Sequence, residues 1–220
     1  MKPWLTSFVV VLFSLNAFAT GQYPDRFIHE GTEYSLDIYP LEEYFHQHPE
    51  KRLPDTISNS GLARGYIATY EIIEGQLFLT DIQVQKYRPN LIGAAEFTWV
   101  SALKTVFPGA ARVKVDWFTG LLDLSFGARL FEEKGDPDPY FYYQYYLVLE
   151  IDKGDYRKEK CFTFPEFRVF VEQQREAFKK TPGYANLKKE VDATVLGYVQ
   201  GRHGPISRNI LRYLPRILED

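Results

Sequence analysis

Apolar and polar residues alternate most regularly in the stretch "ARGYIATYEIIEGQLFLTDIQVQ", residues 63 to 85. A period of two residues is typical of β-strands. Glu74 and Gly75 separate the two alternating runs, and glycine can take the positive φ that a two-residue hairpin turn requires. Both faces are largely apolar, which predicts a central hairpin covered on at least part of each side. The expected facing pairs are Ile72 and Leu77, Tyr70 and Leu79, Thr69 and Thr80, and Ile67 and Ile82.

The same alternation predicts three more hairpins. One, in "ARVKVDWFTGLLDLSF", turns at Thr119-Gly120 and pairs residues 113–117 with residues 122–126. Another, in "YYLVLEIDKGDYRKEKCF", turns at Lys153-Gly154 and has a charged return strand that resembles a sheet edge. A short pair surrounds Gly31. With the two strands on either side of Gly31, the expected sheet has six to eight antiparallel strands. The inner face of the Lys153-Gly154 hairpin is expected to carry Leu147, Leu149 and Ile151.

Helical spacing begins only after Pro165. In "FPEFRVFVEQQREAFKK" the apolar residues recur on one stripe, which predicts an amphipathic helix. A second stripe, from Leu187 to Val199, predicts another helix that ends near Gly201, and a short third segment begins near Ser207. Strands followed by helices indicate an α+β fold. We therefore expect one domain over residues 20–220, with the sheet over 26–164 and the helices over 165–220.

The first residues predict export. Lys2 precedes the apolar run "FVVVLF" and the small-residue pattern "NAFAT", as in a signal peptide spanning residues 1–19. The mature protein is then expected to be secreted or periplasmic. Cys161 is the only cysteine, so the chain forms no internal disulfide. Its position near a strand end predicts a small buried hydrophobe rather than a nucleophile.

Composition narrows the class of partner. The formal net charge is −3, which argues against nucleic acid or an anionic membrane as the partner because both require a basic face. No apolar stretch approaches the roughly 20 residues of a membrane-spanning helix, so stable membrane insertion is not expected. We also expect no cofactor, because the phosphate-cradling glycine loop and the usual metalloprotease and redox motifs are absent.

Two groups of residues are candidates for chemistry. In an extended segment His46 and His48 would share a face and could hold zinc with a carboxylate, although a solvated loop is favoured because three or four converging ligands are needed. The Thr119-Gly120 hairpin would place Asp116 opposite Asp123. Close carboxylates separate their pKa values and are compatible with acid/base catalysis, whereas an exposed sheet face is the simpler interpretation.

A tyrosine-rich run, "YFYYQYY", covers residues 140 to 146. One face of such a strand must be core. The other would present phenols, including Tyr140, Tyr142 and Tyr146, that could contact a protein or stack on a flat ligand. Packing within the sheet is the alternative, and it is the commoner reason for such a run.

The segments "FIHEGTEYSLDIYPLEEYF", "RGYIATYEIIEGQLFLTDIQV" and "VDWFTGLLDL" together resemble a family of uncharacterised bacterial proteins. In that family an Arg-Gly-Tyr strand leads a hairpin and an Asp-Trp-Phe turn follows. The resemblance covers residues 26 to 125 and implies a fold but no activity. Ala63 stands where the family usually has tryptophan before Arg64, and the continuation after Leu124 departs from the family's glycine-rich pattern.

These features favour an exported, non-catalytic protein that binds another protein or an envelope polymer through a sheet face, with Arg64 and the tyrosine-rich strand as candidate contacts. The alternative is a hydrolase-like enzyme that acts on a cell-envelope polymer and uses Asp116 and Asp123 as acid and base.

Overall fold

The computed structural model describes residues 22–54, 56–89, 95–130 and 142–184. The expected signal peptide, Tyr140 and the two helices expected beyond residue 184 lie outside these ranges. Within them the protein has an α+β fold dominated by one mixed sheet. Its strands are β1 Asp25–His29, β2 Thr32–Leu36, β3 Ile67–Ile73, β4 Gln76–Pro89, β5 Ala95–Ser101, β6 Val113–Lys114, β7 Gly120–Leu130, β8 Tyr142–Asp152 and β9 Asp155–Thr163. Its helices are α1 Pro40–Gln47, the 3-10 helix η1 Pro49–Lys51, α2 Leu103–Val106 and α3 Phe164–Phe178.

The sheet runs in the order β2-β1-β3-β4-β9-β8-β7, and β5 and β6 both pair with β4. The expectation of a purely antiparallel sheet is wrong at one place, since β1 pairs with β3 in parallel. The reason is the long connection between β2 and β3. β2 runs back to the end of the sheet where β1 begins, and this connection, which carries α1 and η1, passes β1 and enters β3 at that same end.

Three of the expected hairpin turns are confirmed. Each has two residues in the left-handed region, with φ of 49° and 75° at Glu30-Gly31, 51° and 74° at Glu74-Gly75, and 49° and 75° at Lys153-Gly154. These values match the primed turns whose twist suits antiparallel strands.

The register of the β3–β4 hairpin is confirmed only near its turn. Ile72 faces Leu77 and Tyr70 faces Leu79, as predicted. A β-bulge then shifts the pairing, so that Thr69 faces Asp81 and Ile67 faces Gln83. Thr80 is the extra residue, and its hydroxyl donates to the Thr69 carbonyl at 3.2 Å.

The expected hairpin at Thr119-Gly120 is wrong. β6 pairs with β4, where Val113 faces Leu79, and β7 pairs with β8 instead. Val115 and Phe118 are fully buried, so the chain between β6 and β7 turns at residues 115–118 and fills the core instead of forming a hairpin turn at Thr119-Gly120. Backbone bonds fix it on both sides, from Val115 N to Leu77 O at 2.9 Å and from Gly154 N to Phe118 O at 3.1 Å.

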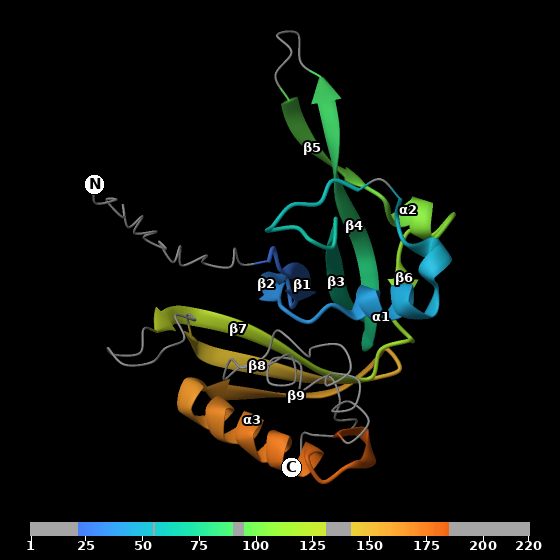
Figure 1. The fold of residues 1–220 in the computed structure, drawn as a ribbon. Helices are drawn as coiled ribbons and strands as arrows, with labels where there is room; N and C mark the ends of the chain where they lie inside the picture. The colour runs from blue at the N-terminus through green and yellow to red at the C-terminus, as the bar shows by residue number, and fades with distance from the viewer. Residues whose placement is uncertain (1–21, 55, 90–94, 131–141, 185–220) are drawn as a thin grey trace, which may run out of the picture.

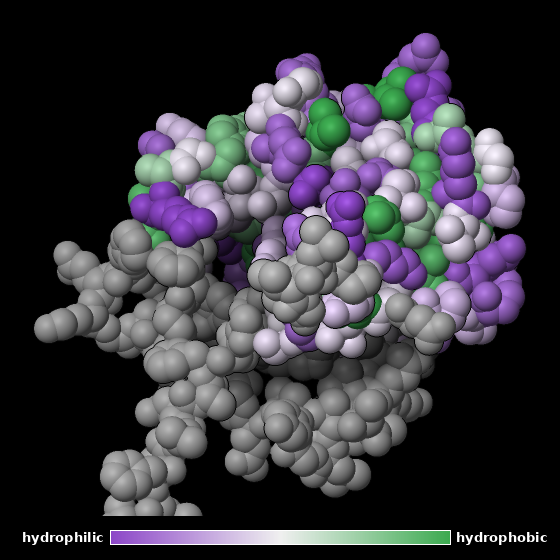
Figure 2. Space-filling model, turned by 90° about the horizontal axis from the view of Figure 1, so that it is seen from above, coloured by the Kyte–Doolittle hydropathy of each residue, from purple (hydrophilic) through white to green (hydrophobic). Residues whose placement is uncertain are grey.

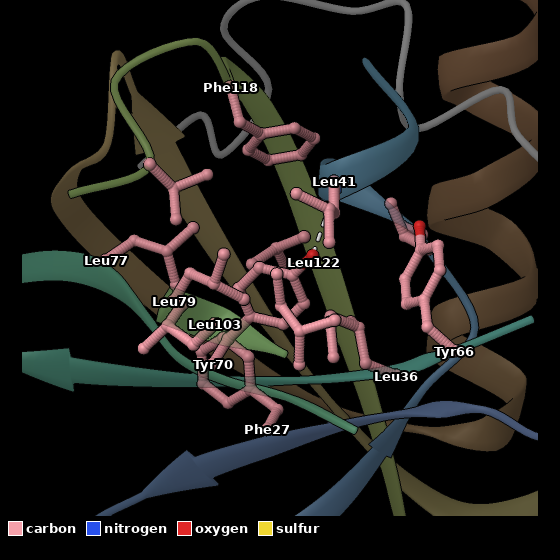
Figure 3. Packing of buried hydrophobic residues seen from close by; sticks show 14 of the residues in the cluster. Phe27, Leu36, Leu41, Tyr66, Tyr70, Leu77, Leu79, Leu103, Phe118 and Leu122 are labelled. Atoms are coloured by element: carbon pink, nitrogen blue, oxygen red, sulfur yellow. Dashed lines mark hydrogen bonds between the residues drawn. The ribbon is translucent and has the colours of Figure 1, made fainter. Parts of the chain in front are cut away.

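The sheet curls around its core. β4 and β9 share a single pair, Gln76 with Asp155, so the strands form two groups that face each other across the buried side chains (Figure 1). The two ends of the sheet also meet, because the ring of Tyr34 on β2 lies edge-on to that of Phe126 on β7 at 6.1 Å. Figure 3 shows the packing between the groups, with Phe27, Leu36, Leu41, Tyr70, Leu77, Leu79, Leu103, Phe118 and Leu122.

The helix predicted after Pro165 is confirmed as α3, which packs against β8 and β9 through Phe170 and Phe178. A capping box begins it, since the backbone N–H and hydroxyl of Thr163 both donate to Glu166 Oε2, at 2.8 and 2.7 Å. The expectation of a buried Cys161 is wrong. The thiol is exposed, because Phe162 takes the α3-facing side of β9 and β9 pairs with little beyond β8 there.

Candidate functional site

A group of ionisable side chains lies inside the fold next to α1. Asp25, at the start of β1, has no exposed surface. Its Oδ1 accepts hydrogen bonds from Ala68 N at 3.0 Å and from Arg64 Nη2 at 3.3 Å. Burial removes the carboxylate from water, and the opposing effect of Arg64 is smaller, so the pKa of Asp25 is raised to about 7.

Arg64, a predicted binding residue, is the buried partner of that carboxylate. Its side chain is 11% exposed, donates to the Tyr23 carbonyl at 2.7 Å and stacks over the ring of Tyr39 at 3.5 Å. Among the residues that the structure describes, none forms a hydrogen bond with Asp25 Oδ2 or Arg64 Nε. The Asp25 carboxyl is shielded from solvent, so it can hold a proton near neutral pH, and its burial beside Arg64 affects the stability of the fold.

The same region clamps α1 through four side chains. Tyr66 donates its hydroxyl to Glu42 Oε1 at 2.8 Å, and Arg52 donates to Glu42 Oε2 at 2.6 Å. The Tyr70 hydroxyl accepts the backbone N–H of Leu41 at 2.9 Å, drawn as a dashed line in Figure 3. Trp117 Nε1 donates to the carbonyl of Pro40 at 2.9 Å. The Arg-Gly-Tyr and Asp-Trp-Phe motifs therefore meet at one helix.

A second polar contact joins β1 to β9. His29 is buried, and its Nε2 lies 2.8 Å from Glu159 Oε2 without the alignment of a hydrogen bond. The ring of Tyr156 lies 6.4 Å from that of His29. Burial, with the negative charge of Glu159, raises the pKa of Tyr156 to about 12, so the phenol keeps its proton at neutral pH. We assign this cluster to holding the two strands together.

The two aspartates expected to face each other do not meet. Asp116 is exposed in the turn after β6, and Asp123 on β7 faces Val148 on β8. Desolvation of the half-buried Asp123 carboxyl is the main reason that its pKa is raised to about 6, and the charge of Asp37 adds to the shift. The expected pairing is wrong because it rested on the Thr119-Gly120 hairpin, which does not form.

The two candidate metal ligands lie at the end of a helix. His46 is in the last turn of α1 and His48 is its C-terminal cap, both exposed, so the extended segment that a shared face would require does not form. His48 instead lies against the ring of Tyr44 at 4.6 Å. Across the described ranges no group of three or more histidine, cysteine or acidic side chains is placed to hold a metal ion.

The tyrosine-rich strand is largely covered. Tyr146 is 8% exposed and stacks on Phe167 of α3, with ring centroids 4.0 Å apart. The ring of Tyr142 lies 4.5 Å from that of Phe164. α3 therefore takes the face on which a row of free phenols was expected, which agrees with the alternative of packing within the fold.

Exposed aromatic residues gather elsewhere, on a two-stranded arm made of residues 84–89 of β4 and 95–100 of β5. The arm rises above the rest of the molecule (Figure 1). Tyr87 faces Phe97 and Gln85 faces Trp99, so the three rings share one side, which we call the aromatic face. Tyr87, Phe97 and Trp99 are 53%, 54% and 39% exposed.

The opposite side of the arm is charged. Lys86 faces Thr98 and Arg88 faces Glu96. Viewed from above, the molecule shows hydrophilic residues with smaller hydrophobic areas between them (Figure 2). Against such a surface, three large exposed rings on one side of a projecting ribbon are the feature most typical of a contact site.

The sequence carries a signal for this arm that the motifs above do not use. In "KYRPNLIGAAEFTWVS", Tyr87 lies between two charged residues before the glycine, and Phe97 and Trp99 occupy alternate positions after it. The sequence gives less indication of the buried network around Asp25 and Glu42. Asp25 and Glu42 look like ordinary polar residues until the parallel β1–β3 pairing brings Asp25 to Arg64.

No protein-family model, curated protein or solved structure matches this chain, so the resemblance drawn from its motifs stays a prediction. Over the ranges that the structure describes, every helix is too short or too polar to cross a membrane.

Proposed function

We propose that this chain is an exported, non-catalytic interaction protein that binds a macromolecular partner through the aromatic face of its arm. The observation that carries the proposal is the exposure of Tyr87, Phe97 and Trp99 together on one side of a projecting ribbon. Export rests on the N-terminal sequence alone.

Two physical arguments support this surface. Aromatic rings bury a large apolar area at a small cost in side-chain entropy, and they are the residues on which binding energy concentrates at interfaces. A two-stranded ribbon is only marginally stable in water by itself. An arm that extends away from the core therefore gains from contact with another molecule.

The alternative, a hydrolase-like enzyme using Asp116 and Asp123, lacks the close carboxylate pair on which it was based. Asp25, the other acid with a raised pKa near neutrality, is fully buried. The geometry therefore favours binding over catalysis.

Site-specific photo-crosslinking in the producing cells tests the proposal. A photoreactive phenylalanine analogue replaces Phe97, and a matched control replaces Val169 on α3, which is exposed to a similar extent, 58% against 54%. We expect a covalent product of higher mass from position 97 at several-fold greater yield than from position 169. Equal yields, or no product from position 97, would contradict the proposal.

A further inference from the structure

The outer edge of β5 has no neighbouring strand among the described residues. β5 pairs with β4 along its whole length, from Ser101 with Gln83 to Ala95 with Pro89. In an antiparallel pair the backbone N–H and C=O groups that do not bond inward point away from the partner strand. The edge of β5 therefore offers a row of backbone donors and acceptors.

The two edges of the arm differ in how they are protected. Natural edge strands carry lysine, proline or a bulge that prevents another strand from adding. The β4 edge of the arm carries Lys86, Arg88 and Pro89. The β5 edge, "AEFTWVS", has one charge, Glu96, no proline and a regular register without a bulge. Only the β4 edge has the usual protection.

Resting on the proposed function, we infer that the partner is a protein that adds an extended segment as a new strand along the outer edge of β5. This mode of binding takes affinity from main-chain hydrogen bonds and specificity from alternate side chains. The added strand would place apolar side chains beside Phe97 and Trp99 on the aromatic face. Glu96, the single charge of β5, lies on the charged side of the arm, and we expect the added strand to place a basic residue beside it there.

A polysaccharide fits this surface less well. Sugar rings can stack on the aromatic face, but they would leave the backbone groups of the β5 edge unused. A strand uses the edge and the rings together, and it converts the marginal two-stranded ribbon into a three-stranded sheet. The combination of an unprotected edge with flanking rings therefore favours a protein segment.

Register partners provide a matched test. Lys86 and Thr98 face each other on the charged side of the arm, so they differ chiefly in which edge they adjoin. The photoreactive phenylalanine analogue is placed at each of them in turn, and at Phe97. We expect position 98 to give the same partner product as position 97, at several-fold higher yield than position 86. Hydrogen exchange of the complex captured through position 97 should show slower exchange of the β5 amides, a readout that does not depend on substitution at position 98.

The other outcomes are separable. Products from position 97 alone, with unchanged exchange of the β5 amides, would overturn strand addition and leave the proposed function standing. No product from any arm position would overturn both. A product with the mass of two copies of this chain would show self-association instead of a foreign strand. A product degraded by glycan-cleaving enzymes but not by protease would identify a polysaccharide and overturn the inference.

Discussion

At the scale of single residues, the fold holds two carboxyl groups that resist ionisation, Asp25 and Asp123. Burial raises the pKa of Asp25 to about 7 and that of Asp123 to about 6, against 3.8 for a free aspartate. A raised pKa means that the folded state binds the proton more tightly than the unfolded chain does. The stability that each group contributes is therefore complete below about pH 4 and is lost as the pH rises through its folded pKa.

Replacing Asp123 by asparagine should remove its part of this pH dependence. The variant keeps the shape of the side chain but cannot ionise, so its free energy of unfolding should fall less steeply than that of the parent between pH 4 and pH 6. Above pH 6 it should be more stable by on the order of 1–2 kcal/mol: a rise of about two pKa units at about 1.4 kcal/mol each sets an upper value of about 3 kcal/mol, and the partial exposure of Asp123 reduces it. Asp25 maintains a slope up to about pH 7 in both proteins.

Urea unfolding followed at pH 4, 5, 6 and 7.5 provides the measurement. Asp116→Asn is the control, because Asp116 is exposed and its substitution should change stability by no more than about 0.5 kcal/mol at any of these pH values. Parallel curves for Asp123→Asn and the parent would show that the carboxyl of Asp123 is solvated.

At the scale of elements, α1 depends on residues from four other parts of the chain. Tyr66, Tyr70 and Trp117 bond its first turn, and Arg52 bonds Glu42 from the loop that follows. The loop between η1 and β3 is closed by Gly65, with φ of +77°. That conformation sets Arg64 towards Asp25 and lets the chain enter β3 at Ile67.

Gly65→Ala should be far more damaging than Gly75→Ala. Both positions have positive φ, 77° and 74°, which costs an alanine about 1 kcal/mol. An added Cβ at Gly75 meets no atom of the described residues within 4 Å, whereas one at Gly65 would lie 2.7 Å from Cβ of Thr56. We expect a loss of on the order of 3 kcal/mol at Gly65 and about 1 kcal/mol at Gly75. Thermal unfolding of the two variants compares them directly, and similar losses would show that Thr56 moves away at little cost.

Local signals predicted the elements more successfully than their partners. Alternation and turn chemistry located the hairpins at Gly31, Gly75 and Gly154, because the positive φ of a two-residue turn is written in the residues themselves. Thr119-Gly120 offered a similar signal, but burial of Val115 and Phe118 outweighed it. Tertiary packing therefore overrode the local turn signal, and tertiary packing cannot be seen in a single sequence.

The candidate site shows the same division. The Asp116–Asp123 pair depended on one hairpin register and was lost with it. Arg64 was predicted to contact a partner molecule, and in the structure it pairs with Asp25, which β1 brings close through a parallel pairing that hairpin reasoning does not produce. The exposed rings of the arm follow simple alternation and were predictable. Their exposure was not, because it depends on where the covering elements lie.

At the scale of the whole molecule, the arm and the body differ in how deeply their side chains are buried. The body has a curled sheet around a continuous core that reaches Val84 and Ala102 at the base of the arm. Beyond that base, the exposed residues are Lys86, Tyr87, Arg88, Glu96, Phe97, Trp99 and Val100. Side chains that are so exposed contribute little to stability, which is in keeping with the proposal that the arm contacts a partner.

Excising the arm should separate folding from binding. Replacing residues 85–99 by Asn-Gly joins Val84 to Val100, which already face each other, through a turn suited to a two-residue hairpin. The shortened protein should unfold cooperatively, with a free energy of unfolding within about 1 kcal/mol of the parent, because the buried residues at the base are kept. The near-ultraviolet circular dichroism of Trp117, which packs against Phe107 and Tyr44, should persist.

In a competition experiment, an excess of the parent protein should displace the partner captured through position 97, and the same excess of the shortened protein should not. Loss of cooperative unfolding would place the arm within the folding unit, and equal competition would show that the partner contacts the body instead.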